Sequence, residues 1–421
     1  MKVFKFGGAS VSTAERIKNV GKILKKYSDE KILIVVSAMG KTTNALEKVV
    51  EAFYSSDQQK ALELFQKIKE DHLSLARELS GHPAPVEGHH SLIDFFTEVE
   101  WLLHDKPLRN FDYYYDQVVC IGEMLSSTIV GNYLNSAGVS NQWIDVRDII
   151  RTDDNFRDAR IDWSFTRKRV EESILPLFEK TNMVLTQGFI GATDENESTT
   201  LGREGSDYSA AVFANLLDAE SQTIWKDVQG VMNADPKQYQ DAQWIKKLNY
   251  QEVIEMAYYG AQVIHPKTIK PLQNKNIPLY VRSFIHPDEE GTCIQSQNFN
   301  HLPPIIVYKH NQVLIELKSK DFSFVGEGLT AEVYKIFQSI KFKPNLIQSA
   351  AISLLCVVDD FSDKVQEFAL KASGVFDVNV SRDLILLTIR HYNDQILSEL
   401  VGDKQTVLRQ QTPETVQVLM G

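Results

Sequence analysis

Near its start the chain contains Val3-Phe4-Lys5-Phe6-Gly7-Gly8-Ala9-Ser10-Val11, in which a largely apolar run is followed by two glycines. Apolar residues then return at helical spacing between Ile17 and Leu24, so the stretch predicts a strand, a tight turn and a helix. Glycines let backbone N–H groups approach an anion, and a helix N-terminus carries partial positive charge. The spacing fits neither the P-loop nor GxGxxG, so a merely solvated lysine stays an alternative. We predict a phosphate site formed by Lys5, Gly7, Gly8 and Ser10.

Further strand-like runs lie between helix-like stretches along the first two thirds of the chain. This alternation predicts an α/β fold with a mainly parallel sheet between helices, and ligands bind beyond the carboxyl ends of such strands. One stretch, residues 45–115, is instead rich in Leu, Glu, Lys and Gln and predicts helical hairpins that form an insertion or lid. The predicted strands are 3–6, 32–36, 183–185, 222–225 and 278–281.

A cluster of turn-forming residues between 283 and 304 marks a domain boundary. We predict a catalytic domain at 1–290 and a second region at 305–421, built from two small α+β modules of which the second is shortened. The pattern predicts helices at 330–340 and 362–371, and strands at 313–318, 346–348, 352–358, 375–380, 384–389 and 416–419.

Composition limits the function classes. The chain has 421 residues, 43% hydrophobic and 24% charged, which is typical of an ordinary globular protein of two or three domains. A net charge of −11 disfavours nucleic acid as a partner, and any anionic substrate needs local positive groups. No apolar run approaches the ~20 residues of a membrane span, and no secretory signal opens the chain, so we expect a cytoplasmic protein without membrane attachment. Three distant cysteines, without a CxxC pair or a histidine cluster, predict free thiols and no protein-held metal.

Two more loops follow strands and carry polar groups. Residues 37–44 (SAMGKTTN) contain Ser37 and Thr43, whose hydroxyls suit a small polar substrate, although for this segment taken alone capping of the next helix by Thr42 or Thr43 is favoured. Residues 199–207 (TTLGREGSD) place Arg203 between glycines at a helix start. A guanidinium there suits a carboxylate, so we favour a site at this loop even though Asp207 alone is also a plausible helix cap.

Other polar positions allow two interpretations. Residues 225–237 offer a base or ribose site at a strand end, but Asp235-Pro236 is more simply a turn. Glu123 follows an apolar run, which suggests an ammonium partner, and an exposed acid in a first helical turn is the alternative. His265, before Pro266, is more plausibly structural than catalytic.

In this order, the segments resemble the aspartate kinases of the amino acid kinase superfamily over nearly the whole chain. The family opens with Lys-Phe-Gly-Gly-Thr-Ser-Val, which differs here only at Ala9. Its Thr-Leu-Gly-Arg-Gly-Gly-Ser-Asp loop differs only at Glu204. The segment from Phe324 to Val333 resembles the effector loop and helix of the paired ACT domains in this family. The resemblance thus implies an amino acid kinase fold followed by two ACT-like modules.

The resemblance also implies roles for individual residues. Lys5 would contact the transferring phosphate, and Asp207 would organise Lys5, the substrate ammonium or a metal. Arg203 would hold the α-carboxylate of the substrate. The remaining substrate residues would be Ser37, Thr43, Glu123 and Ser206. The nucleotide residues would be Lys226, Asp227, Met232, Lys237, Gln262 and Val263.

This chain departs from the family at several of these positions. Gln262 replaces a frequent Lys and Lys237 a frequent Arg, while Glu204 adds a negative charge beside Arg203. The lysine-sensitive members show an Asp and a Thr-Ser pair where this chain has Asn345 and then Ser349-Ala350-Ala351. The departures leave open the ATP contacts, the effect on substrate capture and the identity of any effector.

The activity implied is transfer of the γ-phosphate of ATP, with Mg²⁺, to the side-chain carboxylate of L-aspartate. That reaction gives 4-phospho-L-aspartate, the first step toward lysine, threonine and methionine. The resemblance further implies an amino-acid effector at the ACT-like region and a homodimer or higher homo-oligomer. Two alternatives remain: a kinase for another acid, such as glutamate or N-acetylglutamate, and a catalytically silent amino-acid sensor.

Overall fold

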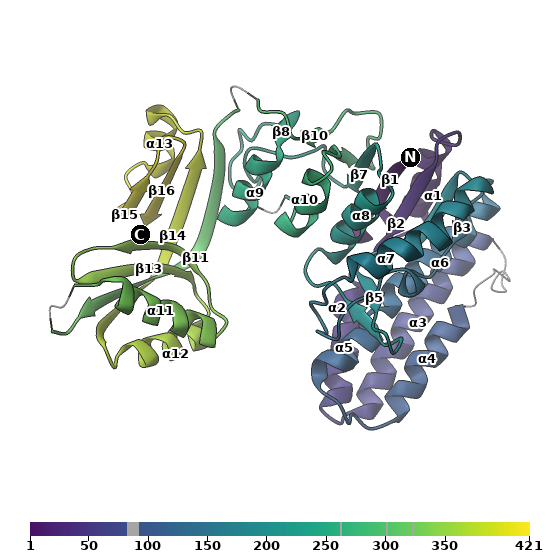
Figure 1. Cartoon of the computed structure of the whole chain (residues 1–421), viewed down its shortest axis with the longest axis horizontal. Coiled ribbons are helices and arrows are strands. Elements are labelled where there is room, and N and C mark those ends of the chain that lie inside the picture. Colours follow the sequence, from purple (N-terminus) through teal and green to yellow (C-terminus); the bar gives the residue numbers. More distant parts are fainter. Residues whose placement is uncertain (82–91, 262, 300–301, 322–323) are drawn as a thin grey trace. The chain divides into compact units, whose positions relative to one another are not determined.

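The structure is a computed structural model that describes residues 1–421 except 82–91, 262, 300–301 and 322–323. Its contacts divide the chain into two compact units (Figure 1). The first contains residues 1–231, 244–254 and 263–299, and the second contains residues 232–243, 255–262 and 300–421. This division differs from the predicted domain ranges 1–290 and 305–421, because two short segments, residues 232–243 and 255–262, belong to the second unit. The roles of the predicted domains stay predictions.

The first unit is built on an eight-stranded sheet in the order β3-β4-β2-β1-β7-β9-β10-β8. All neighbours from β3 to β9 are parallel, whereas β10 pairs antiparallel with β9 and β8 pairs parallel with β10. This confirms the mainly parallel sheet. The strands are β1 (Lys2–Phe6), β2 (Ile32–Val36), β3 (Gln142–Trp143), β4 (Met183–Gln187), β7 (Ser221–Lys226), β8 (Lys247–Asn249), β9 (Leu279–Ser283) and β10 (Thr292–Gln295), with a separate hairpin of β5 (Ile190–Ala192) and β6 (Ser198–Thr200).

Helices cover this sheet on two sides and give the expected three-layer α/β/α arrangement (Figure 1). Helix α6 packs on β2, β3 and β4, whereas α8 packs on β1, β2 and β7. Strand β2 is wholly apolar and fully buried, as a central strand covered on both faces must be. The helices of these layers are α1 (Ala14–Lys25), α6 (Ile121–Ser136), α7 (Trp163–Arg169), α8 (Gly205–Leu216) and α10 (Pro266–Gln273), with short helical turns η1 (Gly8–Val11), η2 (Val146–Asp148), η3 (Val170–Ile174) and η4 (Leu175–Glu179).

The described residues of the stretch 45–115 form helices joined by short turns, as predicted. It forms α2 (Thr42–Tyr54), α3 (Gln58–Ser80), α4 (Leu92–His104) and α5 (Phe111–Val119). Helix α3 packs against α2 and α4, and α5 packs against α2 and α6. No described helix is both long and apolar enough to cross a membrane. All three cysteines are free.

The second unit is a six-stranded antiparallel sheet in the order β12-β13-β11-β14-β16-β15. Its strands are β11 (Ile305–Ser319), β12 (Pro344–Ser349), β13 (Ser353–Asp359), β14 (Phe376–Arg390), β15 (Thr406–Gln411) and β16 (Thr415–Met420). Its helices are α11 (Glu327–Ser339), α12 (Ser362–Ala372) and α13 (Asp394–Val401), while α9 (Tyr250–Tyr259) has residues in both units.

Two long strands join the halves of this sheet, which corrects the prediction of separate strands at 375–380 and 384–389. Strand β14 is continuous, and Asp383 bridges the two halves with a positive φ of 59°. Its partner β11 changes register between Lys309 and Leu314. One core, centred on the stacked rings of Phe337 and Phe368, lies in the half that contains α11 and α12, and a second core includes residues of β16 and α13. The antiparallel sheet and helices are consistent with two ACT-like modules.

Candidate active site

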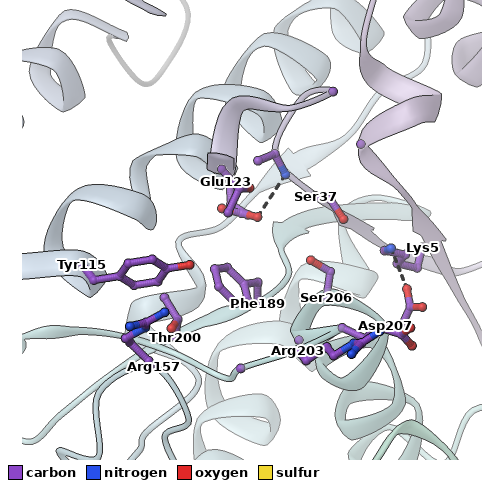
Figure 2. A pocket seen from close by; sticks show the side chains of 17 residues that line it. Lys5, Ser37, Tyr115, Glu123, Arg157, Phe189, Thr200, Arg203, Ser206 and Asp207 are labelled. Atoms are coloured by element: carbon purple, nitrogen blue, oxygen red, sulfur yellow. Dashed lines mark hydrogen bonds and ion pairs between the residues drawn. The ribbon is translucent and has the colours of Figure 1, made fainter. Parts of the chain in front are cut away.

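A pocket of about 470 Å³ opens in the first unit at the carboxyl ends of β1 and β2 and the start of α8. Figure 2 shows Lys5 and Asp207 at one side of it, Tyr115 and Arg157 at the other, and Ser206 between them. The lining residues are Lys5, Gly8, Ser37, Ala38, Gly40, Thr43, Tyr115, Glu123, Arg157, Phe189, Thr200, Gly202, Arg203, Glu204, Gly205, Ser206 and Asp207. The predicted catalytic and substrate residues therefore all line one pocket.

Two glycine-containing loops form the floor. Because β1 and β2 pair in parallel with Phe6 opposite Val36, the loops that follow them leave the sheet side by side. The Gly40 amide donates to the Gly8 carbonyl oxygen at 3.0 Å. A Cβ on Gly8 would lie 2.6 Å from the carbonyl oxygen of Ala38, so only glycine allows this approach. The close contact brings the end of β1 next to Ser37.

The catalytic pair predicted from the sequence meets in the structure. The Lys5 ammonium lies 2.6 Å from a carboxylate oxygen of Asp207, and the two residues are only 8% and 4% exposed. Asp207 lies in the first turn of α8 without capping it, because Glu204 is the N-cap residue. Burial alone would raise the pKa of Asp207, but the charges of Lys5 and Lys226 hold it below its ordinary value. Asp207 therefore stays ionised at neutral pH.

Glu123 is an acid enclosed in the protein, which excludes the alternative of an exposed residue in a first helical turn. It is 3% exposed in the first turn of α6, and one carboxylate oxygen accepts the Ala38 amide at 3.1 Å. The other oxygen, Oε2, is buried without a hydrogen-bond partner among the described residues. Burial raises the pKa of Glu123 to about 8, which hydrogen bonding to Ala38 and the charge of Lys5 only partly offset. Oε2 of this carboxyl group can therefore bind a positively charged group of a ligand.

Arg203 projects from the loop that joins β6 to α8. Gly202 before it has a φ of +77°, and Glu204 after it has a φ of 55°, so the chain makes a tight left-handed turn around it. Arg203 is exposed and makes no ion pair with any residue that the structure describes. Its guanidinium is therefore available for a carboxylate ligand. Thr43 of α2 also lines the pocket, and neither it nor Thr42 caps that helix, whose N-cap is Lys41.

Sequence reasoning missed the wall opposite Lys5. Arg157 lies over the ring of Tyr115, with 4.4 Å from the guanidinium carbon to the ring centre. The buried carboxylate of Asp116 accepts the amides of Arg157 and Thr200, at 3.0 and 2.8 Å, and the Thr200 hydroxyl at 2.7 Å. Burial raises the pKa of Asp116 to about 6 against these hydrogen bonds. An acid among the aromatic residues of α5 was the only sequence signal for this wall.

The predicted nucleotide residues are only partly placed. Gly8 and Lys5 line the pocket, and Gly7 lies beside Lys5, since a Cβ on it would be 3.5 Å from Nζ. Ser10 is buried and donates its hydroxyl to the Trp225 carbonyl oxygen at 3.2 Å, which joins the first loop to β7. Ser10 is not among the lining residues, and its role as a phosphate ligand stays a prediction.

The strand-end segment after β7 holds the other nucleotide candidates of the first unit. Lys226 ends β7 and donates to the Val263 carbonyl oxygen at 2.9 Å, so these two candidates contact each other. Asp227 is exposed. Met232 and Lys237 belong to the second unit, and Gln262 lies outside the described residues. The nucleotide roles of all six residues therefore remain predictions.

The structure agrees with a turn at Asp235-Pro236 and with a structural role for His265. Asp235 accepts the Lys237 amide at 2.9 Å, as in an Asp-Pro turn, and His265 is the N-cap of α10, where its side chain accepts the Lys267 amide. Among the residues that the structure describes, no three His, Cys, Asp or Glu side chains gather as a metal site.

A pocket lined by a buried lysine, at the carboxyl edge of a parallel α/β sheet, is typical of enzymes that act on small charged substrates. Comparison with known proteins gives the particular family. The sequence model of the amino acid kinase family matches residues 1–283. The chain is 30% identical over 398 residues to lysine-sensitive aspartokinase 3 of Escherichia coli (strain K12), covering 92% of this chain and 86% of that protein. The chain therefore belongs to the amino acid kinase family and, within it, to the aspartokinases.

Other similarities agree. The chain is 32% identical over 365 residues to the chloroplastic aspartokinase 2 of Arabidopsis thaliana, and it spans 66% of that protein's length against 85% of its own. The crystal structure of E. coli aspartokinase III in complex with aspartate and ADP superposes with a TM-score of 0.83 at 26% identity, covering 100% of this chain and 96% of the other. A complex of the same enzyme with lysine and aspartate gives a TM-score of 0.81 at 26% identity.

Proposed function

We propose that this chain is an aspartate kinase, which transfers the γ-phosphate of ATP to the side-chain carboxylate of L-aspartate and releases ADP and 4-phospho-L-aspartate. The observation that carries the proposal is the pocket itself. It combines the Lys5–Asp207 pair, the Arg203 guanidinium, which forms no ion pair with a described residue, and the buried Oε2 of Glu123, which has no described hydrogen-bond partner. The similarity to an aspartokinase that binds aspartate and ADP supports it.

The substrate needs no general base. A side-chain carboxylate has a pKa of about 4, so at neutral pH it is already ionised and nucleophilic. The difficulty is that two anions must approach each other. Positioning of the carboxylate in line with the γ-phosphorus and positive charge around the transferring group must therefore supply the catalysis.

Lys5 is the residue suited to the transferring phosphate. Its ammonium is buried beside Asp207, so its charge is held in place and little screened by water. Asp207 fixes the direction of that ammonium. As the γ-phosphate leaves ADP, Lys5 stabilises the negative charge on its oxygens, while the glycine-loop amides beside it provide further donors.

Three charged groups of the pocket match the three charged groups of aspartate. Arg203 holds the α-carboxylate in a bidentate contact, and Oε2 of Glu123 binds the ammonium. The side-chain carboxylate then faces Lys5. The hydroxyls of Ser37, Thr43 and Ser206 surround the backbone of the substrate.

Mg²⁺ would come with the nucleotide, because phosphate oxygens are its usual ligands in kinases. Asp207, an ionised carboxylate at the Lys5 side of the pocket, is the protein group that fits it. The ion would add positive charge to the transferring phosphate.

A kinase for glutamate or N-acetylglutamate and a silent amino-acid sensor are less well supported. N-acetylglutamate has no ammonium to match Glu123, and a sensor has no need of the Lys5–Asp207 pair. Regulation by an amino acid at the second unit, a homo-oligomeric assembly and a cytoplasmic location stay predictions; lysine is bound in the structure of one relative.

ADP release with ATP, Mg²⁺ and a panel of amino acids tests the proposal. Aspartate alone should give sustained turnover, and hydroxylamine should trap the acyl phosphate as the hydroxamate. Turnover with glutamate or N-acetylglutamate instead would favour the second kinase activity. ADP release with none of the panel, by a folded protein, would leave the sensor.

A further inference from the structure

Glu204 is the residue at which this chain departs from the glycine of the Arg203 loop, and the structure places it in a backbone conformation that favours glycine. Its φ of 55° and ψ of 29° are left-handed, where a side chain costs free energy that glycine avoids. The residue also brings a negative charge into a pocket that must accept anions. Both effects oppose a glutamate here unless its side chain makes a compensating contact.

That contact is a hydrogen bond to the start of another helix. The Glu204 carboxylate oxygen Oε2 accepts the backbone amide of His265 at 2.8 Å. His265 is the N-cap of α10, where the helix has partial positive charge that suits a carboxylate. One carboxylate oxygen is thus directed toward the helix and paired there.

The same helix start holds the loop at a second point. The Lys267 ammonium donates to the Leu201 carbonyl oxygen at 3.0 Å and pairs with Asp158 at 2.7 Å. The hydrogen bonds from the Lys267 ammonium to Leu201 and from the His265 amide to Glu204 therefore hold the loop on both sides of Arg203.

The segment before α10 also contacts the end of β7. Val263 accepts from the Lys226 ammonium at 2.9 Å, and the charge of Lys226 helps to keep Asp207 ionised. Residues 263–267 thus lie between Lys226 on one side and the Arg203 loop on the other.

We infer that Glu204 is a positioning residue: its bond to the His265 amide holds the Arg203 loop in the conformation that captures the acidic substrate. The inference rests on the proposed function for its kinetic readout, but the bond itself is independent of activity. The competing account is electrostatic, in which Glu204 only repels the anionic substrate and its removal improves binding.

Three variants separate these accounts. Glu204→Gly removes the carboxylate and also relieves the left-handed backbone, so it should fold. Glu204→Ala removes the carboxylate but keeps the backbone cost. Glu204→Gln removes the charge but keeps an oxygen that can accept the His265 amide.

Steady-state kinetics at saturating ATP should show the aspartate KM raised about 10-fold in Glu204→Gly and Glu204→Ala, since a hydrogen bond to a charged group is lost. Glu204→Gln should restore the KM to within about 3-fold of the unchanged protein, because it keeps the acceptor. A lower or unchanged aspartate KM in both Glu204→Gly and Glu204→Ala overturns the inference. A Glu204→Gln variant as impaired as Glu204→Ala also overturns it.

Hydrogen exchange of the full chain, followed by mass spectrometry, tests the bond without activity. Peptides covering residues 201–208 and 263–272 should exchange faster in Glu204→Gly than in the unchanged protein and in Glu204→Gln. Equal exchange in all three overturns the inference even if the kinetics change. If the unchanged protein forms no ADP with aspartate, the proposed function fails, and this exchange comparison still decides the role of Glu204.

Discussion

The two units each contain a polar cluster with a buried member, Glu123 in the first and Gln312 in the second, and the clusters differ in how many of their polar groups are paired within the protein. In the first unit, Glu123 keeps a buried oxygen without a described partner, and the exposed Arg203 forms no ion pair with a described residue. In the second, the side-chain oxygen of Asn345 accepts a hydrogen bond from the Lys309 ammonium at 2.6 Å. The side-chain amide of Asn345 donates to Gln312 and Asp359 at 2.7 and 2.9 Å. Buried polar groups are costly unless paired. We therefore propose that the incomplete cluster is a ligand site and that the complete one stabilises the fold.

The largest effect expected from this contrast is in Lys5→Met. Loss of the ammonium that faces the transferring phosphate should lower kcat by about 10³-fold while the protein stays folded. Lys2→Met is the matched control, because Lys2 lies on the same strand but pairs with Glu30 outside the pocket. Near-normal kcat in Lys5→Met would remove Lys5 from the mechanism.

Arg203→Ala should have the next largest effect. Without the guanidinium, the aspartate KM should rise by about 10²-fold through loss of a charged bidentate contact, with little change in the KM for ATP. The aspartate KM of Arg203→Lys should lie between those of the unchanged protein and Arg203→Ala, since lysine keeps the charge but not the planar pair of donors. An equal rise in both KM values would contradict the substrate role of Arg203.

The pH dependence of the aspartate KM tests Glu123. Its pKa of about 8 in the free protein means that the carboxyl is mostly protonated at pH 7. An ammonium ligand favours the ionised form, so the KM should fall by roughly 8-fold as the pH rises from 7 to 8.5 and the ionised fraction grows. Glu123→Gln should have a higher KM without this slope. A KM that is flat in the unchanged protein would argue against an ammonium contact.

The smallest effect on activity is expected in the complete cluster. Asn345→Ala leaves Lys309 and Asp359 without a shared partner and should destabilise the second unit by about 1–3 kcal/mol. The aspartate and ATP KM values should not change. Urea denaturation measures the stability, with Gln410→Ala, an exposed residue of β15, as the control. An altered KM with normal stability would show that this cluster is not merely structural.

Local sequence predicted the loops of the site because parallel strands deliver consecutive loops to one edge. Lys5 and Ser37 follow this rule, and the helix start that carries Asp207 meets Lys5 there. The wall made by Arg157 was missed because it depends on Asp116, whose carboxylate joins a loop and a strand distant in sequence. The departure at Glu204 was visible, but its contact with the His265 amide was not.

The same reasoning explains what was missed in the second unit. Helix α13 is short, with one buried residue, Leu397, and β15 is an edge strand where only Leu408 is buried. Eight residues in α13 and six in β15 are too few to stand out in the windows of about 11–18 residues over which periodicity is judged. The continuity of β14 was missed because Ser381-Arg382-Asp383 interrupts its apolar pattern as a turn would.

Isothermal titration of aspartate at pH 7, in buffers of different ionisation enthalpy, most directly tests whether the incomplete cluster is completed by substrate. The account predicts release of close to one proton on binding by the unchanged protein and almost none by Glu123→Gln. Binding without proton release, or the same release in both proteins, would contradict it.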